Sequence, residues 1–418
     1  MNLTTKLSAL RYGFYKDALI MMVAMTLSNF FNYLYQLLMG RLLTPQEYGE
    51  LFSLLSLFYI FSVLSNTVNA SMTKFTAVYK VNNEYGKIKA LLIKATKSLS
   101  LLGIGVYVVL ILLSPFISSF LHIENRVYVI ALFASIPFGL VLPAHQGILR
   151  GLQRFGALGV SVSSWALFKL IFGILLVLLG YGVLGGVLGV FLAHVGAFLI
   201  TLLFLRDLFG YRDGNNHKVE LTDIIKYSVP AFLAIFAYTT MWNIDVIIVK
   251  HYLSPTEAGN YSAISVLGKI ALFAPGAVSM VVFPKAAENH ERGERHLHIL
   301  LRGLALVSLI SGGIVLAYTL FPEFIITFIY GEKYLSVAHY LWRYGLAMMF
   351  LAMSGVAMNY ALSINMTQIS CALIVALLIE VIVIYFLKTS LSGIVDGMIL
   401  VSALAFFLTM LVLWRNIK

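Results

Sequence analysis

Charged residues are scarce in this sequence of 418 residues: Asp, Glu, Lys and Arg make up 11% of it, whereas hydrophobic residues make up 60%. A soluble domain of average composition is about one quarter charged. A single protein core cannot bury this much apolar surface, so lipid must cover much of it. The composition argues against a soluble two-domain protein and predicts an all-α integral membrane protein.

Cysteine and catalytic motifs are also lacking. The one cysteine, Cys371, lies in an apolar run, so we expect no intrachain disulfide and interpret Cys371 as a packing residue. The sequence has no Walker loop, no HExxH, no Cys or His cluster with metal-ligand spacing and no nucleophile elbow. We therefore expect no ATP hydrolysis, no catalytic site and no metal site.

Long apolar runs fill most of the chain, and a spanning helix needs roughly 20 such residues. The basic lead-in Met1–Lys16 precedes a run long enough to span, so we expect a retained first helix rather than a cleaved signal. The stretch Phe324–Tyr340 is also apolar, and we interpret it as an interfacial or re-entrant piece. The predicted spans are Ala18–Met39, Leu51–Met72, Ser98–Leu121, Val127–Leu149, Leu158–Gly180, Val183–Leu205, Tyr227–Val249, Tyr261–Phe283, Ile299–Phe321, Leu341–Leu362, Ile369–Leu387 and Leu391–Trp414.

Lys and Arg predict the orientation of these twelve spans. With the N-terminus in the cytoplasm, most of the 29 Lys and Arg residues fall in cytoplasmic connections, where membrane proteins concentrate them. We therefore predict a plasma-membrane protein with both termini in the cytoplasm. The net charge of +11 then indicates contact with anionic lipid rather than with nucleic acid. The exceptions on the outer side are Arg41, Arg126, Lys250, Lys333, Arg343 and Lys388.

A short sequence recurs between the first two spans of each half. Leu43, Pro45, Glu47 and Gly49 are matched at a constant offset of 210 residues, and Thr44 is matched by a serine. Six spans separate the copies, so the halves share one orientation, related by an axis along the membrane normal. Because each copy has the same place in its half, we favour a true repeat over a chance match.

The repeat predicts the domain organisation. We expect an N-terminal lobe of six spans at 1–206, a cytoplasmic linker at 207–226 and a C-terminal lobe of six spans at 227–418. Two parallel bundles around a central cavity are typical of alternating-access transport, in which one bundle rocks against the other. Such a mechanism requires a polar lining.

Polar stripes run along four predicted spans. Asn29, Asn32 and Gln36 share one helical face in the first span, and Asn66 and Asn69 do so in the second. The seventh span carries Trp242, Asn243 and Asp245, and the eighth carries Ser262, Ser265 and Lys269. These faces must look at protein or water because lipid cannot satisfy them. We favour a hydrated cavity, and interhelical hydrogen bonding is the alternative.

Ionisable side chains inside spans point to function more strongly, because a charge in the bilayer is costly. Lys169 and Lys269 are candidates to bind an anionic substrate, together with Arg41 and Arg150 at span ends and the polar residues Asn32, Asn66, Trp242 and Asn243. Asp245 and Glu380 are candidates to bind a coupling ion, Na⁺ or H⁺. The alternative for the lysines and carboxylates is buried pairing, in which one of these carboxylates neutralises a lysine. The alternative for the span-end arginines is anchoring at the membrane interface.

Four segments have the motifs of a known family: Asn32–Leu51 with its Gly40–Gly49 loop, Gln146–Phe155, Asn243–Asp245 and Ala258–Tyr261. They resemble those of polysaccharide-type (Wzx-like) flippases of the multidrug/oligosaccharidyl-lipid/polysaccharide superfamily, over essentially the whole chain. The resemblance implies a MATE-like fold. It implies export of a polyprenyl-phosphate- or diphosphate-linked oligosaccharide to the outer leaflet, through a cationic cavity and coupled to a cation gradient.

Three other functions are alternatives to a flippase. A cation-coupled multidrug exporter of the same superfamily typically uses acidic cavity groups, whereas mid-span lysines in both halves favour an anionic cargo. A membrane glycosyltransferase or polymerase would need a long outer loop with catalytic residues, and the outer connections here are short. A scaffold role would not explain buried charges. The partners we expect are the lipid-linked substrate, membrane lipids and polysaccharide-assembly proteins, around a monomeric chain.

Overall fold

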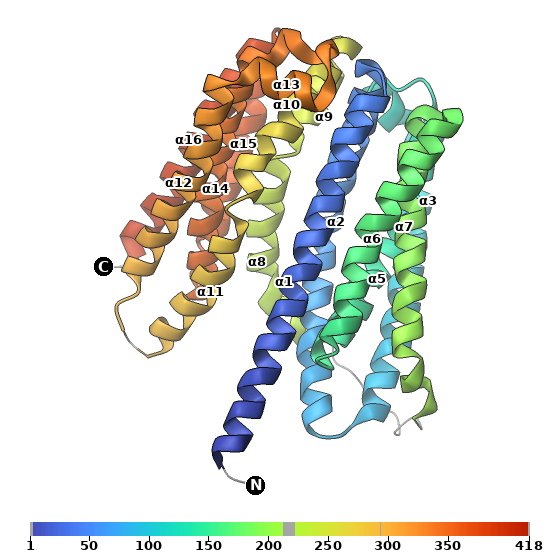
Figure 1. Cartoon of the computed structure of the whole chain (residues 1–418), viewed down its shortest axis with the longest axis vertical. Helices are drawn as coiled ribbons and strands as arrows, with labels where there is room; N and C mark the ends of the chain where they lie inside the picture. The colour runs from blue at the N-terminus through green and yellow to red at the C-terminus, as the bar shows by residue number, and fades with distance from the viewer. Residues whose placement is uncertain (1–2, 212–221, 293, 417–418) are drawn as a thin grey trace. The chain divides into compact units, whose positions relative to one another are not determined.

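The computed structural model describes residues 3–211, 222–292 and 294–416, which are helical apart from short connections, with no strand among them. Figure 1 shows the course of the chain. The elements of the first half are α1 (Leu3–Leu42), α2 (Pro45–Val81), α3 (Tyr85–Phe120), α4 (Arg126–Phe133), α5 (Ile136–Gly151), α6 (Phe155–Leu176), the π-helical turn η1 (Val177–Tyr181), α7 (Gly182–Leu205) and the 3-10 turn η2 (Arg206–Gly210). Those of the second half are α8 (Thr222–Met241), α9 (Ile244–Tyr252), α10 (Pro255–Phe273), α11 (Gly276–Glu291), α12 (Leu297–Leu320), α13 (Pro322–Tyr330), the 3-10 segment η3 (Glu332–Tyr340), α14 (Leu341–Ser363), α15 (Ile369–Leu387) and α16 (Leu391–Asn416).

Helices cover every predicted span. Eight helical segments of the described chain are long and apolar enough to cross a bilayer, one of which joins α4 and α5 across a short turn, and the bent pair α8–α9 makes a ninth. One of the eight, Phe155–Gly210, contains two predicted spans, since α6 and α7 turn back and run side by side (Figure 1). Gly180, at a φ of +90°, makes that turn, a conformation that favours glycine. α1 and the pair α10–α11 occupy the remaining predicted spans.

Three predicted spans are broken rather than continuous. Val127–Leu149 is divided between α4 and α5, and Pro137 stands in the first turn of α5. Tyr261–Phe283 is divided after Phe273, immediately before Pro275. Proline has no N–H to continue a helical ladder and is tolerated at a helix start, so both breaks follow from the sequence. The third break, in Tyr227–Val249, forms part of the site described below.

The structure supports the 210-residue repeat at the level of single hydrogen bonds. Thr44 and Glu47 form a capping box at the start of α2, in which the carboxylate accepts from the Thr44 N–H at 2.9 Å. Ser254 and Glu257 form the same box at the start of α10, with the corresponding bond at 3.1 Å. The recurring Pro follows each cap residue directly, where it suits the first helical position. The repeated residues are therefore a helix-start signal used twice.

The recurring glycines have a separate cause. A Cβ on Gly49 would lie 2.8 Å from the Gly259 nitrogen, and a Cβ on Gly259 would collide with the Pro45 carbonyl oxygen. The first turns of α2 and α10 therefore meet backbone to backbone, and only glycine allows this approach. We call this contact the repeat crossing.

The described helices form two compact units by their contacts. Unit 1 comprises Met1–Met39, Leu64–Ser119 and Glu124–Ile224; unit 2 comprises Gly40–Val63, Phe120–Ile123 and Ile225–Lys418. Unit 2 thus includes two segments of the first predicted lobe, 40–63 and 120–123. Both lie at the ends of spans predicted to face away from the cytoplasm, which we call the outer end.

Loss of either capping box is expected to destabilise the protein equally. Thr44→Ala and Ser254→Ala should each lower the free energy of unfolding by about 1 kcal/mol, because each orphans N–H groups at a helix start. Thermal unfolding in detergent measures this. Thr319→Ala is the control, since its exposed hydroxyl only donates to its own helix. A cost at one cap and none at the other would contradict equivalence of the repeats.

Candidate functional site

In unit 1, α1 and α6 bring together Lys169 and Asn32, two predicted substrate residues whose contact the sequence did not predict. Lys169 is 1% exposed, and its Nζ donates to the Asn32 Oδ1. The amide nitrogen of Asn32 donates to the Ser28 carbonyl, which leaves its oxygen directed at the lysine. The Lys169 Nζ also lies 4.6 Å from the centroid of the Tyr35 ring and 5.0 Å from that of Trp165. Two aromatic faces and one neutral amide surround the ammonium group.

This arrangement leaves the charge of Lys169 without a carboxylate. No ion pair to Lys169 occurs in the part of unit 1 that the structure describes. Cation–π contacts and one hydrogen bond to an amide oxygen stabilise a buried ammonium only partly, because desolvation of an ion costs several kcal/mol. A group in this state attracts an anion strongly across a low-dielectric interior.

In unit 2, α10 and the α8–α9 break hold the second lysine. Lys269 is 4% exposed, with its Nζ 4.9 Å from the Phe52 ring centroid and 5.7 Å from that of Trp242. It also interacts electrostatically with Asp245. Of the predicted residues, the structure thus brings together Lys269, Trp242 and Asp245. Each unit presents one buried lysine beside a tryptophan and a second aromatic ring.

The third broken span creates this second site. α8 ends at Met241, α9 begins at Ile244, and the two helices are bent by 41°. Asn243 stands in the break, where its amide nitrogen donates to the Thr239 carbonyl at 2.9 Å. Asp245 lies in the first turn of α9, where the helix macrodipole favours a negative charge. The sequence predicted one continuous helix here, because no proline or glycine marks the bend.

Two tyrosines hold Asp245 in place. Tyr261 donates to the Asp245 Oδ2 at 2.9 Å, and Tyr344 donates to the same oxygen at 2.6 Å. Because the Tyr344 proton is used there, the Ser265 hydroxyl donates to the Tyr344 oxygen at 2.9 Å. Neither tyrosine was among the predicted site residues. Tyr261, Ser265 and Lys269 follow one another at intervals of four, which would have placed the first on the polar face.

Glu380, the second predicted ion-coupling residue, lies on α15 and is fully buried. Among the described residues, neither of its carboxylate oxygens has a hydrogen-bond donor, nor has the Asp245 Oδ1. Glu380 interacts electrostatically with Asp245. A carboxyl group in such surroundings is stable only with a bound proton or a bound cation. The two residues thus form a pair with free acceptor capacity, and no group of three or more metal-ligating side chains occurs in the described chain.

Two of the remaining predicted substrate residues, Arg41 and Arg150, lie at span ends. Arg41 is exposed in the last turn of α1. Arg150 is exposed at the end of α5 and donates to the Asn69 Oδ1 at 3.0 Å, while the Asn69 amide donates to the Pro143 carbonyl. The side chain of Asn66 lies outside the described residues. The structure therefore keeps Arg150 and Lys169 at different levels of unit 1.

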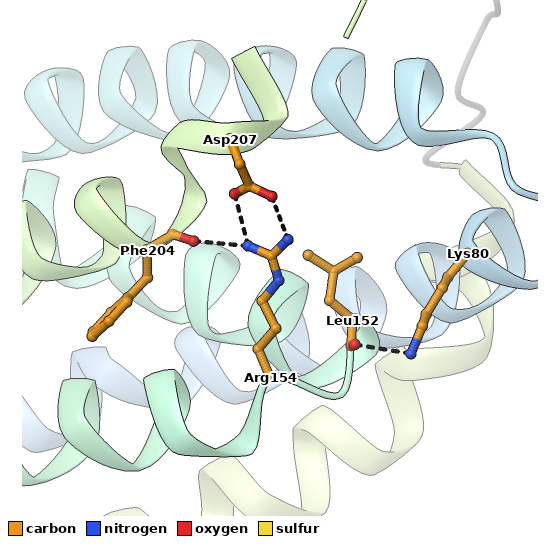
Figure 2. A network of polar contacts seen from close by, with 5 residues as sticks. All are labelled: Lys80, Leu152, Arg154, Phe204 and Asp207. Atoms are coloured by element: carbon orange, nitrogen blue, oxygen red, sulfur yellow. Dashed lines mark hydrogen bonds and ion pairs between the residues drawn. The ribbon is translucent and has the colours of Figure 1, made fainter. Parts of the chain in front are cut away.

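The segment after Arg150 has a packing role (Figure 2). Arg154 clamps Asp207 of η2 through both guanidinium nitrogens and donates to the Phe204 carbonyl at 2.9 Å, while Lys80 donates to the Leu152 carbonyl at 2.9 Å. These bonds join the ends of α2, α5, α6 and α7. Hydrogen bonding to Arg154 lowers the pKa of Asp207 and raises that of Arg154.

The pH dependence of this clamp has a definite sign. Because the pKa of Asp207 is lower in the folded state, its stabilisation is full above about pH 4, the unfolded value, and is lost as pH falls through the folded pKa. Asp207→Asn should lower stability by about 0.2–1 kcal/mol at pH 7, since the pair is half-exposed, and by progressively less as the pH falls through the folded-state pKa of Asp207. Thermal midpoints at pH 7 and at acid pH measure this. Asp396→Asn, which breaks a longer single contact at 3.3 Å, is the control. An equal loss at both pH values would contradict the clamp.

The chain matches the profile of a family described as Polysaccharide biosynthesis protein over residues 14–290, more than half of its length. MJ1375 of Methanocaldococcus jannaschii, an uncharacterized membrane protein, is 24% identical over 330 residues, which are 74% of this chain and 75% of that protein.

Solved structures share the fold at low sequence identity. An inward-facing multidrug resistance MATE family transporter of the MOP superfamily has a TM-score of 0.75 at 16% identity, over 93% of this chain and 94% of its own. The lipid II flippase MurJ has a TM-score of 0.72 at 14% identity, over 93% and 87%. The eukaryotic MATE transporter AtDTX14 has 0.67 at 13% identity, over 97% of each chain.

These likenesses confirm the predicted fold class, a MATE-like arrangement of twelve membrane-spanning helices in a multi-pass membrane protein. The family profile covers the repeated loop, the Gln146–Phe155 segment and the α8–α9 break, which are the segments whose motifs carry the resemblance. The chain therefore belongs to the polysaccharide biosynthesis protein family.

Proposed function

We propose that this protein is a flippase that moves a polyprenyl-phosphate- or diphosphate-linked oligosaccharide from the cytoplasmic to the outer leaflet. The observation that carries the proposal is Lys169, a buried cation whose contacts in the described chain are two aromatic rings and a neutral amide. A lipid phosphate supplies the missing negative charge. The aromatic faces suit the apolar faces of sugar rings.

The lysine of the second unit extends this argument. Lys269 has the same kind of aromatic neighbours and interacts with Asp245. An anionic cargo near Lys269 and an occupied carboxylate pair at Asp245 and Glu380 therefore change one another's free energy. We propose that this linkage couples cargo movement to a cation gradient by alternating access, with H⁺ or Na⁺ bound at the carboxylates.

A cation-coupled multidrug exporter is the second candidate. It is favoured by the buried carboxylates Asp245 and Glu380 and by the fold shared with a multidrug resistance transporter. Such an exporter gives no role to a buried lysine without a carboxylate. The orientation we propose, with both termini in the cytoplasm of a plasma-membrane protein, is common to both candidates.

Complementation separates the two. A bacterial strain lacking its sugar-lipid flippase is supplied with this gene, and the same cells are scored for surface polysaccharide and for resistance to cationic drugs. We expect polysaccharide to return and drug resistance to stay at the level of the empty vector. Raised drug resistance without polysaccharide would contradict the proposal and support the exporter.

A further inference from the structure

The outer end of unit 2 contains a set of contacts that lies outside the site around Lys269 and Asp245. Two segments of the first repeat, 40–63 and 120–123, cluster there with the second repeat. The repeat crossing between Gly49 and Gly259 lies at this end, where α2 and α10 begin. Figure 1 shows α13 beside α10, and η3 follows α13 directly. α13 and η3 are each too short to span a bilayer, so their role must come from what they touch.

η3 caps the end of α1. The Lys333 Nζ donates to the Arg41 carbonyl at 2.9 Å and to the Leu43 carbonyl at 2.6 Å. The Tyr334 hydroxyl donates to the Gly40 carbonyl at 3.3 Å. The last carbonyls of a helix have no partner within it and carry partial negative charge, so an ammonium group suits them. Residues almost 300 positions apart therefore complete one helix end.

Aromatic side chains also pack against one another beside the end of α1. Tyr48, Tyr330 and Tyr334 are all buried, and their ring centroids lie 5.2–6.2 Å apart. Gly40 admits the Tyr330 ring, since a Cβ there would collide with it. Glu47 of the first capping box interacts electrostatically with Lys333. Tyr334 and Lys333 of η3 therefore interact with Tyr48 and Glu47 in the first turn of α2, the turn that forms the repeat crossing.

A related, weaker contact occurs on the other side of the repeat. His251 lies 210 residues after Arg41, and its ring Nδ1 donates to the Phe120 carbonyl at 2.6 Å. The His251 and Phe120 rings stack, with centroids 4.0 Å apart. In each repeat, the segment at the end of the third span thus contacts the first connection of the other repeat. Three hydrogen bonds run from η3 to carbonyls at the end of α1, whereas the one hydrogen bond on the other side runs from the first connection, at His251, to the Phe120 carbonyl.

We propose that η3 is a latch that holds the outer ends of the two repeats closed, and that Lys333 is its positioning residue. The inference rests on the proposed transport function in one respect: the cargo can leave to the outside only when the latch opens. Opening separates Lys333 from the Arg41 and Leu43 carbonyls and releases the repeat crossing. Closing restores both.

Thiol labelling tests the latch without any cargo. Ala258 is 2% exposed beside the repeat crossing, so Ala258→Cys in a Cys371→Ala background reports its opening. The full chain in lipid nanodiscs is labelled with a charged thiol reagent. Lys333→Ala should label at least about tenfold faster than the parent, because hydrogen bonds to a charged group are lost. Lys333→Arg should restore protection, since it keeps the donors and the charge.

Two further variants keep the result interpretable. Lys388→Ala removes another outer lysine, which lies over Tyr252 and Tyr385, and should label at the parent rate. Gly49→Leu cannot form the repeat crossing and should label fastest. Equal thermal midpoints for Lys333→Ala and Lys388→Ala would assign faster labelling to opening rather than unfolding. Labelling of Lys333→Ala no faster than Lys388→Ala, or continued protection in Gly49→Leu, would overturn the proposal. Neither outcome depends on what the protein carries.

Discussion

Lys169→Met and Lys269→Met are each expected to slow the flipping of a lipid-linked oligosaccharide by about 10- to 100-fold. Methionine retains most of the apolar length of the side chain and removes the ammonium group. A charge-assisted hydrogen bond to a phosphate contributes about 1.5–3 kcal/mol, which corresponds to this range. The initial rate of movement in proteoliposomes measures the effect, and thermal unfolding establishes that the variants fold.

Replacement of Lys169 changes fewer charge interactions than replacement of Lys269. Lys169 has no carboxylate partner in the described chain, so its replacement removes a charge and leaves none unpaired. Replacement of Lys269 also leaves Asp245 with one positive neighbour fewer. Lys169→Arg keeps the charge and should retain more activity than Lys169→Met. Lys388→Met, at the outer end, is the matched control. Normal flipping by both methionine variants would eliminate the cationic site.

Asp245→Asn and Glu380→Gln should abolish gradient-driven flipping while cargo exchange down its own gradient persists. Both carboxyl groups are fully buried, and their bare oxygens are the acceptors available for a coupling ion. The amides keep the shape and remove the capacity to carry a proton or to neutralise a cation. Flipping driven by a proton gradient or by a sodium gradient, measured in separate vesicles, identifies the ion.

The tyrosine partners of Asp245 provide a graded control for this prediction. Tyr261→Phe and Tyr344→Phe each remove one donor to the Asp245 Oδ2. A carboxylate that loses a donor binds a cation or a proton more readily. The ion concentration for half-maximal flipping should therefore fall in both variants. Gradient-driven flipping at the normal rate by Asp245→Asn and Glu380→Gln would exclude these carboxylates from coupling.

The sequence predicted the helices and part of the site, for reasons visible at single residues. Apolar length gave the spans, and Pro137 and Pro275 account for two of the breaks. Helical periodicity placed Asn32 on a polar face of the first span, and the structure brings Lys169 of the fifth predicted span to its amide oxygen. The Thr44 and Ser254 loops were recognised as a repeat because a capping box is local chemistry, complete within four residues.

Contacts between residues far apart in the sequence could not be predicted from local patterns. Tyr344 donates to Asp245, 99 positions earlier, and no local sequence pattern indicates this hydrogen bond. The bend before Ile244 occurs without proline or glycine. Arg150 carries a motif of the family, yet its hydrogen bond goes to Asn69 within the helix packing of unit 1. Lys333 looked like an outer-loop lysine, and its partners are carbonyls on a helix almost 300 positions earlier.

Cargo identity is the central claim, and direct transport by the purified protein tests it. Proteoliposomes are loaded either with a fluorescent polyprenyl-diphosphate oligosaccharide or with a fluorescent cationic drug, and the rate of each is followed with and without an ion gradient. We expect the lipid-linked sugar to reach the opposite leaflet, faster with the gradient and slowly in Lys169→Met, while the drug stays at the rate of empty vesicles. Movement of the drug with no movement of the lipid-linked sugar would contradict the account.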